Sequence, residues 1–338
     1  MGFFSLTKEL AIDLGTANTI IIHEGKIVVN EPSIVAVDTT GKLIAVGSRA
    51  QEMEGREPPN IRTVRPLKKG VIADYNAAEQ MIRGLIKMAS SRSSWFSPSL
   101  RLVIGIPSGS TEVEIRAVRD SAEQANGRDV YMIYEPMAAA LGIGLDVQAP
   151  EGNMIVDIGG GTTEIAVISL GGIVSNQSIN IAGDDITEDI IKHMRSEYSV
   201  NVGVRTAEQI KIKVGSALKQ LEDEPEDFIV HGPNLMTGLP MEIPVSYKKV
   251  SEAIEVSIKK IEDAVLYALQ ATPPELYADI VKNGIWLTGG GAMIRGLDKR
   301  LTDKIGIQFR VADDSLLSVA NGTGVALANV DNFGFLIR

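Results

Sequence analysis

The chain has 338 residues, 44% of them hydrophobic, a formal net charge of −10 and no cysteine. Its length is sufficient for two domains with separate cores, and its composition is that of a globular protein. The missing cysteines exclude disulfides and thiolate metal sites, and the acidic balance argues against nucleic acid as a partner.

The first informative segment is a turn between two apolar runs. Asp13-Leu14-Gly15-Thr16-Ala17-Asn18-Thr19 follows the run 10–12 and precedes the run 20–22, which predicts strand, small-residue turn, strand. Further short strands are expected at 26–30, 34–38 and 43–46. The polar segment 52–66, which carries Pro58-Pro59, is expected to be a loop in a small inserted subdomain.

Helices and strands alternate in the following part of the chain. Asn76, with Glu79 in the first turn, predicts a helix N-terminus with a capping box. Thr111 and Glu114 predict a second one, for a helix that ends at Gly127. The remaining expected elements are a loop at 90–99, strands at 101–106 and 130–133, and a small-residue helix at 136–145.

The second half opens on a repeat of the first turn, Asp157-Ile158-Gly159-Gly160-Gly161-Thr162-Thr163, again between two apolar runs. Two copies suggest a duplicated domain with two phosphate-binding turns that face each other. The elements expected after it are helices at 187–198, 206–221 (with Thr206 and Gln209 as a capping box) and 250–271, an inserted hairpin region at 222–241, and a strand at 285–288 that leads into Gly289-Gly290-Gly291.

Each glycine turn can bind an anion, because successive backbone N–H groups in a tight turn form a concave site that phosphate can approach. Neither turn is a P-loop or a dinucleotide fingerprint, since no Lys-Ser/Thr follows and the chain continues into a strand. An ordinary hairpin turn is the alternative for one copy, and the duplication favours phosphate. Asp13 and Asp157 would share a hydrated Mg²⁺ with a triphosphate, or each would cap its own turn.

Three further segments carry weaker signals. Glu135 stands between a buried strand and an apolar helix, where Pro136 is expected to hold it out of helical geometry. It would orient water toward a γ-phosphate, or serve as a helix N-terminal charge. Glu208 and Lys211 share one helix face, which by itself predicts an ion pair. The glycines at 289–291 can press backbone flat against a nucleobase.

In this order the motifs resemble the actin, hexokinase and heat-shock chaperone superfamily, and within it the MreB family of bacterial actins. The resemblance covers essentially the whole chain and rests on six strings: IDLGTANT at 12–19, VNEPS at 29–33, EPMAAA at 135–140, VDIGGGTTE at 156–164, TAEQIK at 206–211 and LTGGGA at 287–292.

This resemblance implies an α/β, actin-like fold of two ribonuclease-H-like domains, each with a smaller inserted subdomain, and nucleotide in the cleft between them. The implied boundaries are 1–32, 75–146 and 314–338 for the first large subdomain (IA), 33–74 for the first small one (IB), 147–182 and 245–313 for the second large one (IIA), and 183–244 for the second small one (IIB).

The resemblance also implies roles for individual residues. Asp13 and Asp157 would surround Mg²⁺ through water, and Glu135 and Thr162, with Asp157, would carry hydrolysis by placing the attacking water. The remaining nucleotide contacts would be Gly15, Thr16, Ala17, Asn18, Thr19, Gly159, Gly160, Gly161, Thr162 and Thr163 on the phosphates, Glu208, Gln209 and Lys211 on ribose and adenine, and Gly289, Gly290, Gly291 and Ala292 beneath the base. No lysine stands in the first turn, so slow turnover is expected.

The implied function is an ATP-binding and slowly hydrolysing cytoskeletal protein whose filaments direct cell shape and cell-wall elongation. Its expected partners are further copies of itself in paired protofilaments, the inner face of the cytoplasmic membrane, RodZ and other wall-elongation proteins. A small-molecule kinase of the same superfamily is the main alternative. A chaperone ATPase is disfavoured, because no substrate-binding domain is expected after Ile294.

Membrane contact is expected from one segment rather than from a spanning helix. No apolar run reaches the roughly 18 residues that a membrane-spanning helix needs, and residues 1–8 lack the apolar core of a signal peptide. The resemblance implies that the adjacent Trp95 and Phe96 insert into the membrane surface, and the alternative is that they fold back onto the core. The resemblance therefore also implies a location that is cytoplasmic and peripheral on the inner face of the cell membrane.

Overall fold

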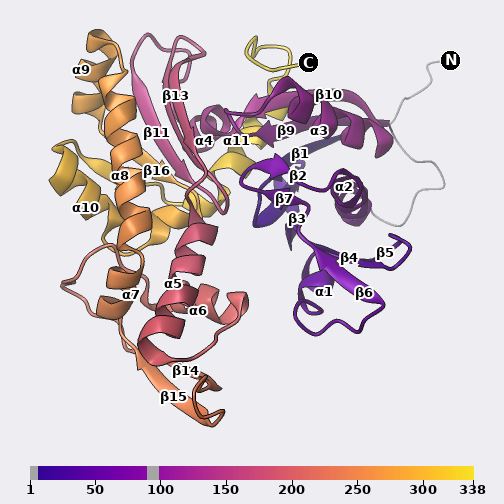
Figure 1. Ribbon diagram of the computed structural model, residues 1–338. Coiled ribbons are helices and arrows are strands. Elements are labelled where there is room, and N and C mark those ends of the chain that lie inside the picture. The colour runs from indigo at the N-terminus through magenta and orange to yellow at the C-terminus, as the bar shows by residue number, and fades with distance from the viewer. Residues whose placement is uncertain (1–6, 90–98) are drawn as a thin grey trace.

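The computed structural model describes residues 7–89 and 99–338, and its two halves are each built around a five-stranded sheet (Figure 1). The strand order is β10-β9-β1-β2-β3 in the first sheet and β13-β12-β11-β16-β17 in the second. The strands are β1 (Thr7–Leu14), β2 (Asn18–His23), β3 (Lys26–Pro32), β9 (Ser99–Ile106), β10 (Gly127–Tyr134), β11 (Asn153–Ile158), β12 (Thr163–Ser169), β13 (Gly172–Ile179), β16 (Ile285–Thr288) and β17 (Phe309–Val311).

Both sheets repeat one pattern of pairing, which is the structural counterpart of the repeated turn. In the first sheet β1, β2 and β3 form an antiparallel meander, and β9 and β10 add in parallel on the other side of β1. In the second sheet β11, β12 and β13 form the meander, and β16 and β17 add in parallel. The two halves are thus topological duplicates, with β1 and β11 as corresponding central strands.

A small lobe is inserted after β3 (Figure 1). It holds the sheet β5-β4-β6 and a two-stranded hairpin, built from β4 (Val35–Asp38), β5 (Leu43–Val46), α1 (Ser48–Gln51), β6 (Ile61–Val64), β7 (Leu67–Lys68) and β8 (Val71–Ile72). The prediction of a loop over 52–66 is wrong at its end, where β6 pairs with β4. Because Ile61 packs on the buried Ile34 and Ala36, four residues are enough for a strand here.

The second inserted lobe contains the helices α5 (Gly183–Tyr198), α6 (Val204–Val214) and α7 (Tyr247–Ala253) and the hairpin of β14 (Phe228–Pro233) and β15 (Pro240–Val245). The expected hairpin is present, and its two strands pair in antiparallel register. The other helices of the two halves are α2 (Tyr75–Ala89), α3 (Glu112–Gln124), α4 (Glu135–Gly142), α8 (Glu255–Gln270), α9 (Pro274–Asn283), α10 (Leu297–Ile305) and α11 (Ser318–Ala328).

Helix ends were predicted with mixed success. The capping box of Thr111 and Glu114 at α3 is confirmed. Helix α2 instead begins at Tyr75, because the Asp74 carboxylate accepts the Ala77 N–H at 3.0 Å. Helix α6 begins after Gly203, so Thr206 is no cap, and it ends at Val214, before an extended Gly215.

The predicted helix at 250–271 is divided in two at Ile254, whose backbone (φ −90°, ψ 0°) interrupts the regular helix between α7 and α8. Ser246 caps the first piece by accepting the Lys249 N–H. The apolar stripe nevertheless continues across the break, because Ile254, Ile258 and Ile261 are all fully buried.

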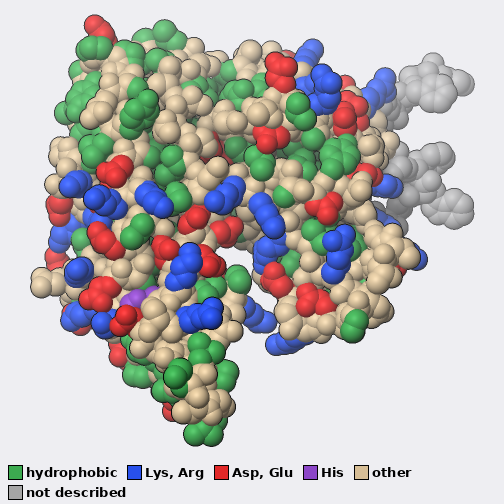
Figure 2. All heavy atoms as spheres, viewed as in Figure 1, with side chains coloured by type: hydrophobic (Ala, Val, Ile, Leu, Met, Phe, Trp, Pro, Cys, Tyr) green, Lys and Arg blue, Asp and Glu red, His purple; other side chains and the backbone are tan. Residues whose placement is uncertain are grey.

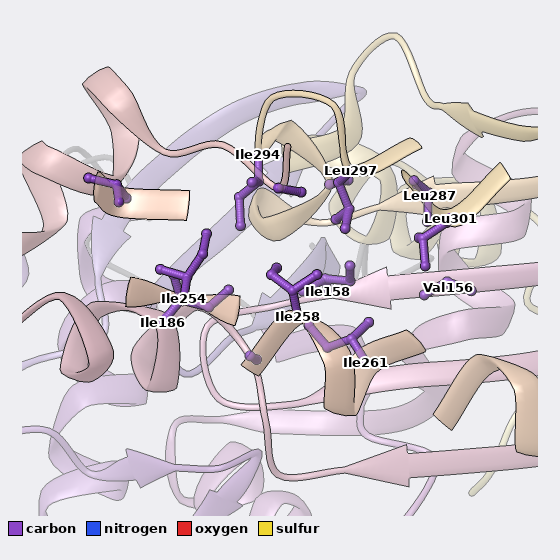
Figure 3. Close-up of a cluster of buried hydrophobic side chains, with 14 of the residues drawn as sticks. Val156, Ile158, Ile186, Ile254, Ile258, Ile261, Leu287, Ile294, Leu297 and Leu301 are labelled. Atoms are coloured by element: carbon purple, nitrogen blue, oxygen red, sulfur yellow. The ribbon is translucent and has the colours of Figure 1, made fainter. Parts of the chain in front are cut away.

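The hydrophobic core of the second half lies directly behind the second glycine turn (Figure 3). Val156 and Ile158 of β11 contact a cluster that includes Ile258 of α8 and Leu297 of α10. A buried methylene contributes about 0.8 kcal/mol, so a cluster of this size fixes β11 firmly. The turn after Ile158 is therefore carried on a rigid support.

A further buried cluster joins the two halves through α4 and α11. It combines Ile133 of the first sheet with Ile155 and Ile168 of the second. The helices approach so closely that a Cβ on Gly142 would lie 1.9 Å from the Ser318 carbonyl oxygen, and one on Gly322 would lie 1.7 Å from that of Ala138. Glycine is required at both positions for the two helices to pack between the sheets.

Candidate functional site

Two glycine turns meet at the centre of the molecule, one from each half. The first turn (residues 15–17) joins β1 to β2, and the second turn (residues 159–162) joins β11 to β12. A Cβ on Gly160 would lie 2.9 Å from the Ala17 Cβ, and one on Gly161 would lie 2.8 Å from the Thr16 hydroxyl oxygen. The structure thus brings the two sequence repeats into contact, and the glycines permit the approach.

The first turn is braced by a serine that the sequence reading gave no role. The Ser33 hydroxyl donates to the Gly15 carbonyl at 2.6 Å, and its backbone N–H donates to the Ala17 carbonyl at 2.9 Å. The Thr19 and Ser33 hydroxyls are 2.9 Å apart, and both residues are buried. Asn18, by contrast, is exposed. The only signal for Ser33 was its place at the end of the string at 29–33.

The second turn is held by the start of α5. The backbone N–H groups of Gly183 and Asp184 donate to the carbonyls of Gly159 and Gly160, at 3.1 and 2.8 Å. The Thr163 hydroxyl donates to the Ile181 carbonyl at 2.7 Å. With these carbonyls paired behind it, the turn can present N–H groups on its other side.

Buried and partly buried carboxylates surround the two turns. Asp13 and Asp157 are the next-to-last residues of β1 and β11, and Glu135 is the first residue of α4. Burial, together with the charge of Asp157, raises the pKa of Asp13 to about 7. Burial raises the pKa of Asp157 to about 6, although the Thr288 hydroxyl donates to it at 2.9 Å. Burial and then the charges of Glu164, Asp13 and Asp157 hold the pKa of Glu135 well above its ordinary value.

Such an excess of buried negative charge fits a cation. Unpaired carboxylates are costly to bury, and a bound cation or its hydration shell would lower all these pKa values. Within residues 7–89 and 99–338, no group of three or more His, Asp or Glu is placed to hold a metal ion directly. A divalent ion here would therefore depend on water and phosphate oxygens for most of its ligands, which agrees with contact to Asp13 and Asp157 through water.

Glu135 differs from its prediction in one respect. It was expected outside the helix, but α4 begins with it and Tyr134 is the N-cap. Pro136 is then the second helical residue. Its lack of an N–H costs no helical hydrogen bond there, because N–H groups in the first turn have no acceptor within the helix. Glu135 keeps the predicted position between strand and helix, and it is only 9% exposed.

Glu208 and Lys211 form the predicted ion pair on α6, with 2.7 Å between the Lys211 Nζ and a Glu208 carboxylate oxygen. The Lys211 ammonium also donates to the Gly183 carbonyl at 2.9 Å, and the Thr187 hydroxyl donates to Glu208 at 2.8 Å. The pair is thereby connected through α5 to the second turn. Gln209 lies exposed beside it.

The segment Gly289–Ala292 lies against the base of the second turn. Gly289 has φ 78°, and a Cβ there would lie 2.4 Å from the Ile158 carbonyl oxygen and 2.7 Å from an Asp157 carboxylate oxygen. A Cβ on Gly291 would lie 2.2 Å from an Ile158 methyl carbon. Gly290 opens the short 3₁₀ helix η1 (Gly290–Met293), in which Ala292 is buried. Thr288, the partner of Asp157, was missed although it adjoins this segment.

A hairpin that the sequence reading also missed covers both turns. The β7–β8 hairpin turns at Lys69 and Gly70, which both have positive φ. The Gly70 N–H donates to the Thr16 hydroxyl at 3.1 Å, and a Cβ on Gly161 would lie 2.8 Å from the Lys69 Cα. The Lys69 ammonium lies 4.0 Å from Asp185 of α5. The available signal was Lys69-Gly70 between Leu67-Lys68 and the apolar pair Val71-Ile72.

Figure 2 shows an open notch between the two inserted lobes, with Lys and Arg side chains on both of its walls. The notch separates the lobe of β4, β5 and β6 from the lobe of α5 and α6 (Figures 1 and 2). Basic side chains at this opening would attract an anionic ligand despite the net charge of −10.

Trp95 and Phe96, the predicted membrane contact, lie outside the residues that the structure describes. Among the helices of the described part, none has both the length and the apolar character to cross a membrane.

Comparison with known proteins identifies a family and relatives that this chain resembles. A family model described as MreB/Mbl protein matches residues 7–334. The chain is 46% identical to the cell shape-determining protein MreB of Escherichia coli strain K12, over 98% of this chain and 96% of that protein. It is 44% identical to the cell shape-determining protein Mbl of Bacillus subtilis strain 168, over 96% and 97%.

Two solved structures have nearly the same backbone. The chain resembles MreB 5 of Spiroplasma citri bound to AMPPNP with a TM-score of 0.89 and 38% identity, over 96% of this chain and 97% of that one. The same protein bound to ADP gives a TM-score of 0.88 and 37% identity, over 97% and 99%. These likenesses confirm the expected actin-like α/β fold.

Proposed function

The chain belongs to the MreB/Mbl family of actin-like, cell shape-determining proteins, and from this premise we propose that it binds and slowly hydrolyses ATP with Mg²⁺ as it assembles into filaments. The observation that carries the proposal is the contact between the two glycine turns above Asp13 and Asp157. Similar structures of a relative bound to AMPPNP and ADP support nucleotide binding.

Nucleotide binding would use the segments that converge on the two turns. The backbone N–H groups of residues 15–19 and 159–163 would hold the phosphates from opposite sides. Glu208 and Lys211 would face the ribose and adenine, and Gly289–Ala292 would lie beneath the base. Asp13 and Asp157 would hold the hydrated Mg²⁺, which on binding supplies positive charge to the phosphates.

Hydrolysis would depend on Glu135 and Thr162. Glu135 is fixed at the start of α4, and burial, followed by the charges around it, raises its pKa. A carboxylate with a raised pKa can orient a water molecule and accept its proton. Thr162, in the second turn and largely buried, would position the same water through its hydroxyl. No lysine from the first turn neutralises the phosphates, which agrees with slow turnover.

The proposal extends to the arrangement of the protein in the cell. Residues 33–74 and 183–244 would be the two small subdomains, and copies of the chain would form paired protofilaments. Trp95 and Phe96 would hold these filaments on the inner face of the cytoplasmic membrane, since many weak anchors add along a polymer. RodZ and other wall-elongation proteins would be the partners there.

The decisive experiment is electron microscopy of the purified protein with Mg²⁺-ATP and lipid vesicles, beside a control without nucleotide. Filaments that need nucleotide and lie on the vesicles would support the proposal. A monomer that still hydrolyses ATP would contradict it and revive the small-molecule kinase. Family membership does not favour that alternative, and the concentration dependence of the ATPase separates the two, because only assembly gives a cooperative onset.

A further inference from the structure

One buried carboxylate near the site has no part in the proposed function. Glu164 lies on β12 and is 0% exposed. In the antiparallel register it stands directly opposite Asp157 of β11, so both side chains are on one face of the second sheet. Its charge contributes to the raised pKa of Glu135, which places it close to the proposed catalytic group.

The hydrogen bonds of Glu164 reach both halves of the molecule. One carboxylate oxygen accepts the Ser178 hydroxyl of β13 at 2.5 Å, within the second sheet. The other accepts the Ser108 hydroxyl, and also the Ser108 N–H at 3.1 Å. Ser108 follows β9 of the first sheet. Hydrogen bonds to a buried charge are among the strong ones, so this contact between the halves is a substantial one.

The loop that carries Ser108 (residues 107–110) is packed between the halves. A Cβ on Gly109 would lie 3.3 Å from the Ser178 Cβ, which brings the loop against β13. On the other side, a Cβ on Gly70 would lie 3.1 Å from a ring carbon of Pro107 and 2.8 Å from the Thr162 methyl. The loop therefore supports the β7–β8 hairpin, whose Gly70 N–H reaches the first turn.

We propose that Glu164 is a positioning residue, whose bond to Ser108 holds the first half against the second so that Glu135 and the two turns stay at fixed separation. The Ser108–Glu164 bridge can fix this separation, because it joins the loop of residues 107–110, which supports the β7–β8 hairpin, to β12. Strand β12 directly follows the second turn. An opening of the two halves would break this bond and leave a buried carboxylate short of donors, which is costly. The inference rests on the proposed ATPase function.

The test compares two serines that donate to the same carboxylate. Ser108→Ala removes a hydroxyl bond between the halves, and Ser178→Ala removes one within the second sheet. Both variants keep Glu164 and the Ser108 N–H. Three quantities are measured: the affinity for Mg²⁺-ATP, the single-turnover hydrolysis rate, and hydrogen exchange in residues 67–72 and 107–110 of the nucleotide-free protein.

We expect Ser108→Ala to lower the single-turnover rate about tenfold and to raise hydrogen exchange in the hairpin, since the loss of one charge-assisted bond is of that order. Ser178→Ala should stay within about twofold of the wild-type rate, because its bond to Glu164 lies within the second sheet and does not join the halves. Ser108→Thr, which keeps a hydroxyl, should restore both the rate and the exchange.

Equal effects of the two alanine variants would overturn the inference, because the contact between the halves would then have no special role. Wild-type levels of both rate and exchange in Ser108→Ala would overturn it as well. A wild-type protein that fails to bind or hydrolyse Mg²⁺-ATP would instead overturn the proposed function. Hydrogen exchange, which needs no nucleotide, would then decide whether the bridge holds the halves together.

Discussion

Replacing Asp157 by Asn should stabilise the nucleotide-free protein while abolishing its response to Mg²⁺-ATP. The pKa of Asp157 is about 6 in the folded protein, against an ordinary value of 3.8. One pKa unit corresponds to about 1.4 kcal/mol, so at pH 8 the ionised side chain costs the folded state about 3 kcal/mol. Asn removes this charge, and its carbonyl oxygen can still accept the Thr288 hydroxyl.

The sign of the effect sets its dependence on pH. Because the folded-state pKa of Asp157 is raised, the folded protein binds more protons than the unfolded chain above pH 4 or so. The wild type therefore loses stability as the pH rises from about 4 through about 6, and Asp13, whose pKa is about 7, extends the loss upward. The advantage of Asp157→Asn should be largest at pH 8 and should shrink toward pH 4 or so.

Thermal unfolding without nucleotide, in a buffer with a metal chelator, measures this difference. With an unfolding entropy of about 2.1 cal/mol/K per residue, a gain of about 3 kcal/mol raises the Tm by about 4 °C. Asp38→Asn is the control, since hydrogen bonds from the Thr40 hydroxyl and the Lys42 N–H hold the pKa of that partly exposed carboxylate below its ordinary value. That variant should lose stability at pH 8.

Addition of Mg²⁺-ATP completes the experiment. Ligand at one hundred times its Kd stabilises a protein by about 2.7 kcal/mol, so the wild-type Tm should rise. In Asp157→Asn this rise should be absent, because the carboxylate proposed to face the metal is gone. A variant that is less stable than wild type at pH 8, or that retains the full rise with Mg²⁺-ATP, would refute the reasoning.

Three further outcomes are expected. Glu135→Ala should leave Mg²⁺-ATP affinity unchanged and slow single-turnover hydrolysis by about 100-fold, and equal hydrolysis would remove Glu135 from the mechanism. Trp95→Ser with Phe96→Ser should release filaments from vesicles in a flotation assay without stopping assembly, and unchanged flotation would place the anchor elsewhere. Gly160→Val should weaken nucleotide affinity, because a Cβ there lies 2.9 Å from the Ala17 Cβ. Gly334→Ala, which meets nothing within 4 Å, is its control and should bind as wild type.

The duplicated architecture was predictable because its signal is local. An Asp-headed turn of small residues between two apolar runs specifies a strand, a turn and a strand, and its recurrence at Asp157 specifies a second sheet of the same kind. The capping box at Thr111 was predictable for the same reason, since both of its hydrogen bonds lie within one helical turn.

Features that depend on distant contacts were missed. The break at Ile254 leaves the apolar stripe intact, so periodicity alone predicts one continuous helix. The side chain of Lys69 is 56% exposed, as is usual for a lysine. Its backbone, however, lies on Gly161 of the other half. A sequence reports side-chain character well, but it does not report which backbone segments meet across a domain boundary.

The duplication also explains why the folded protein is destabilised by its own site when no ligand is bound. Two copies of a turn that begins with Asp bring two carboxylates together when the copies face each other. Burial first, and then the charge of Asp157, raises the pKa of Asp13. The apolar clusters behind β11 and between α4 and α11 provide the stability that offsets this cost. A cation bound between the carboxylates of the two halves would lower this cost. Binding of that cation would then favour the closed arrangement of the halves, since only there do both carboxylates contribute to it. If the proposed function holds, nucleotide binding and the relative position of the halves would be one equilibrium, and the proposed Ser108–Glu164 bridge would couple them.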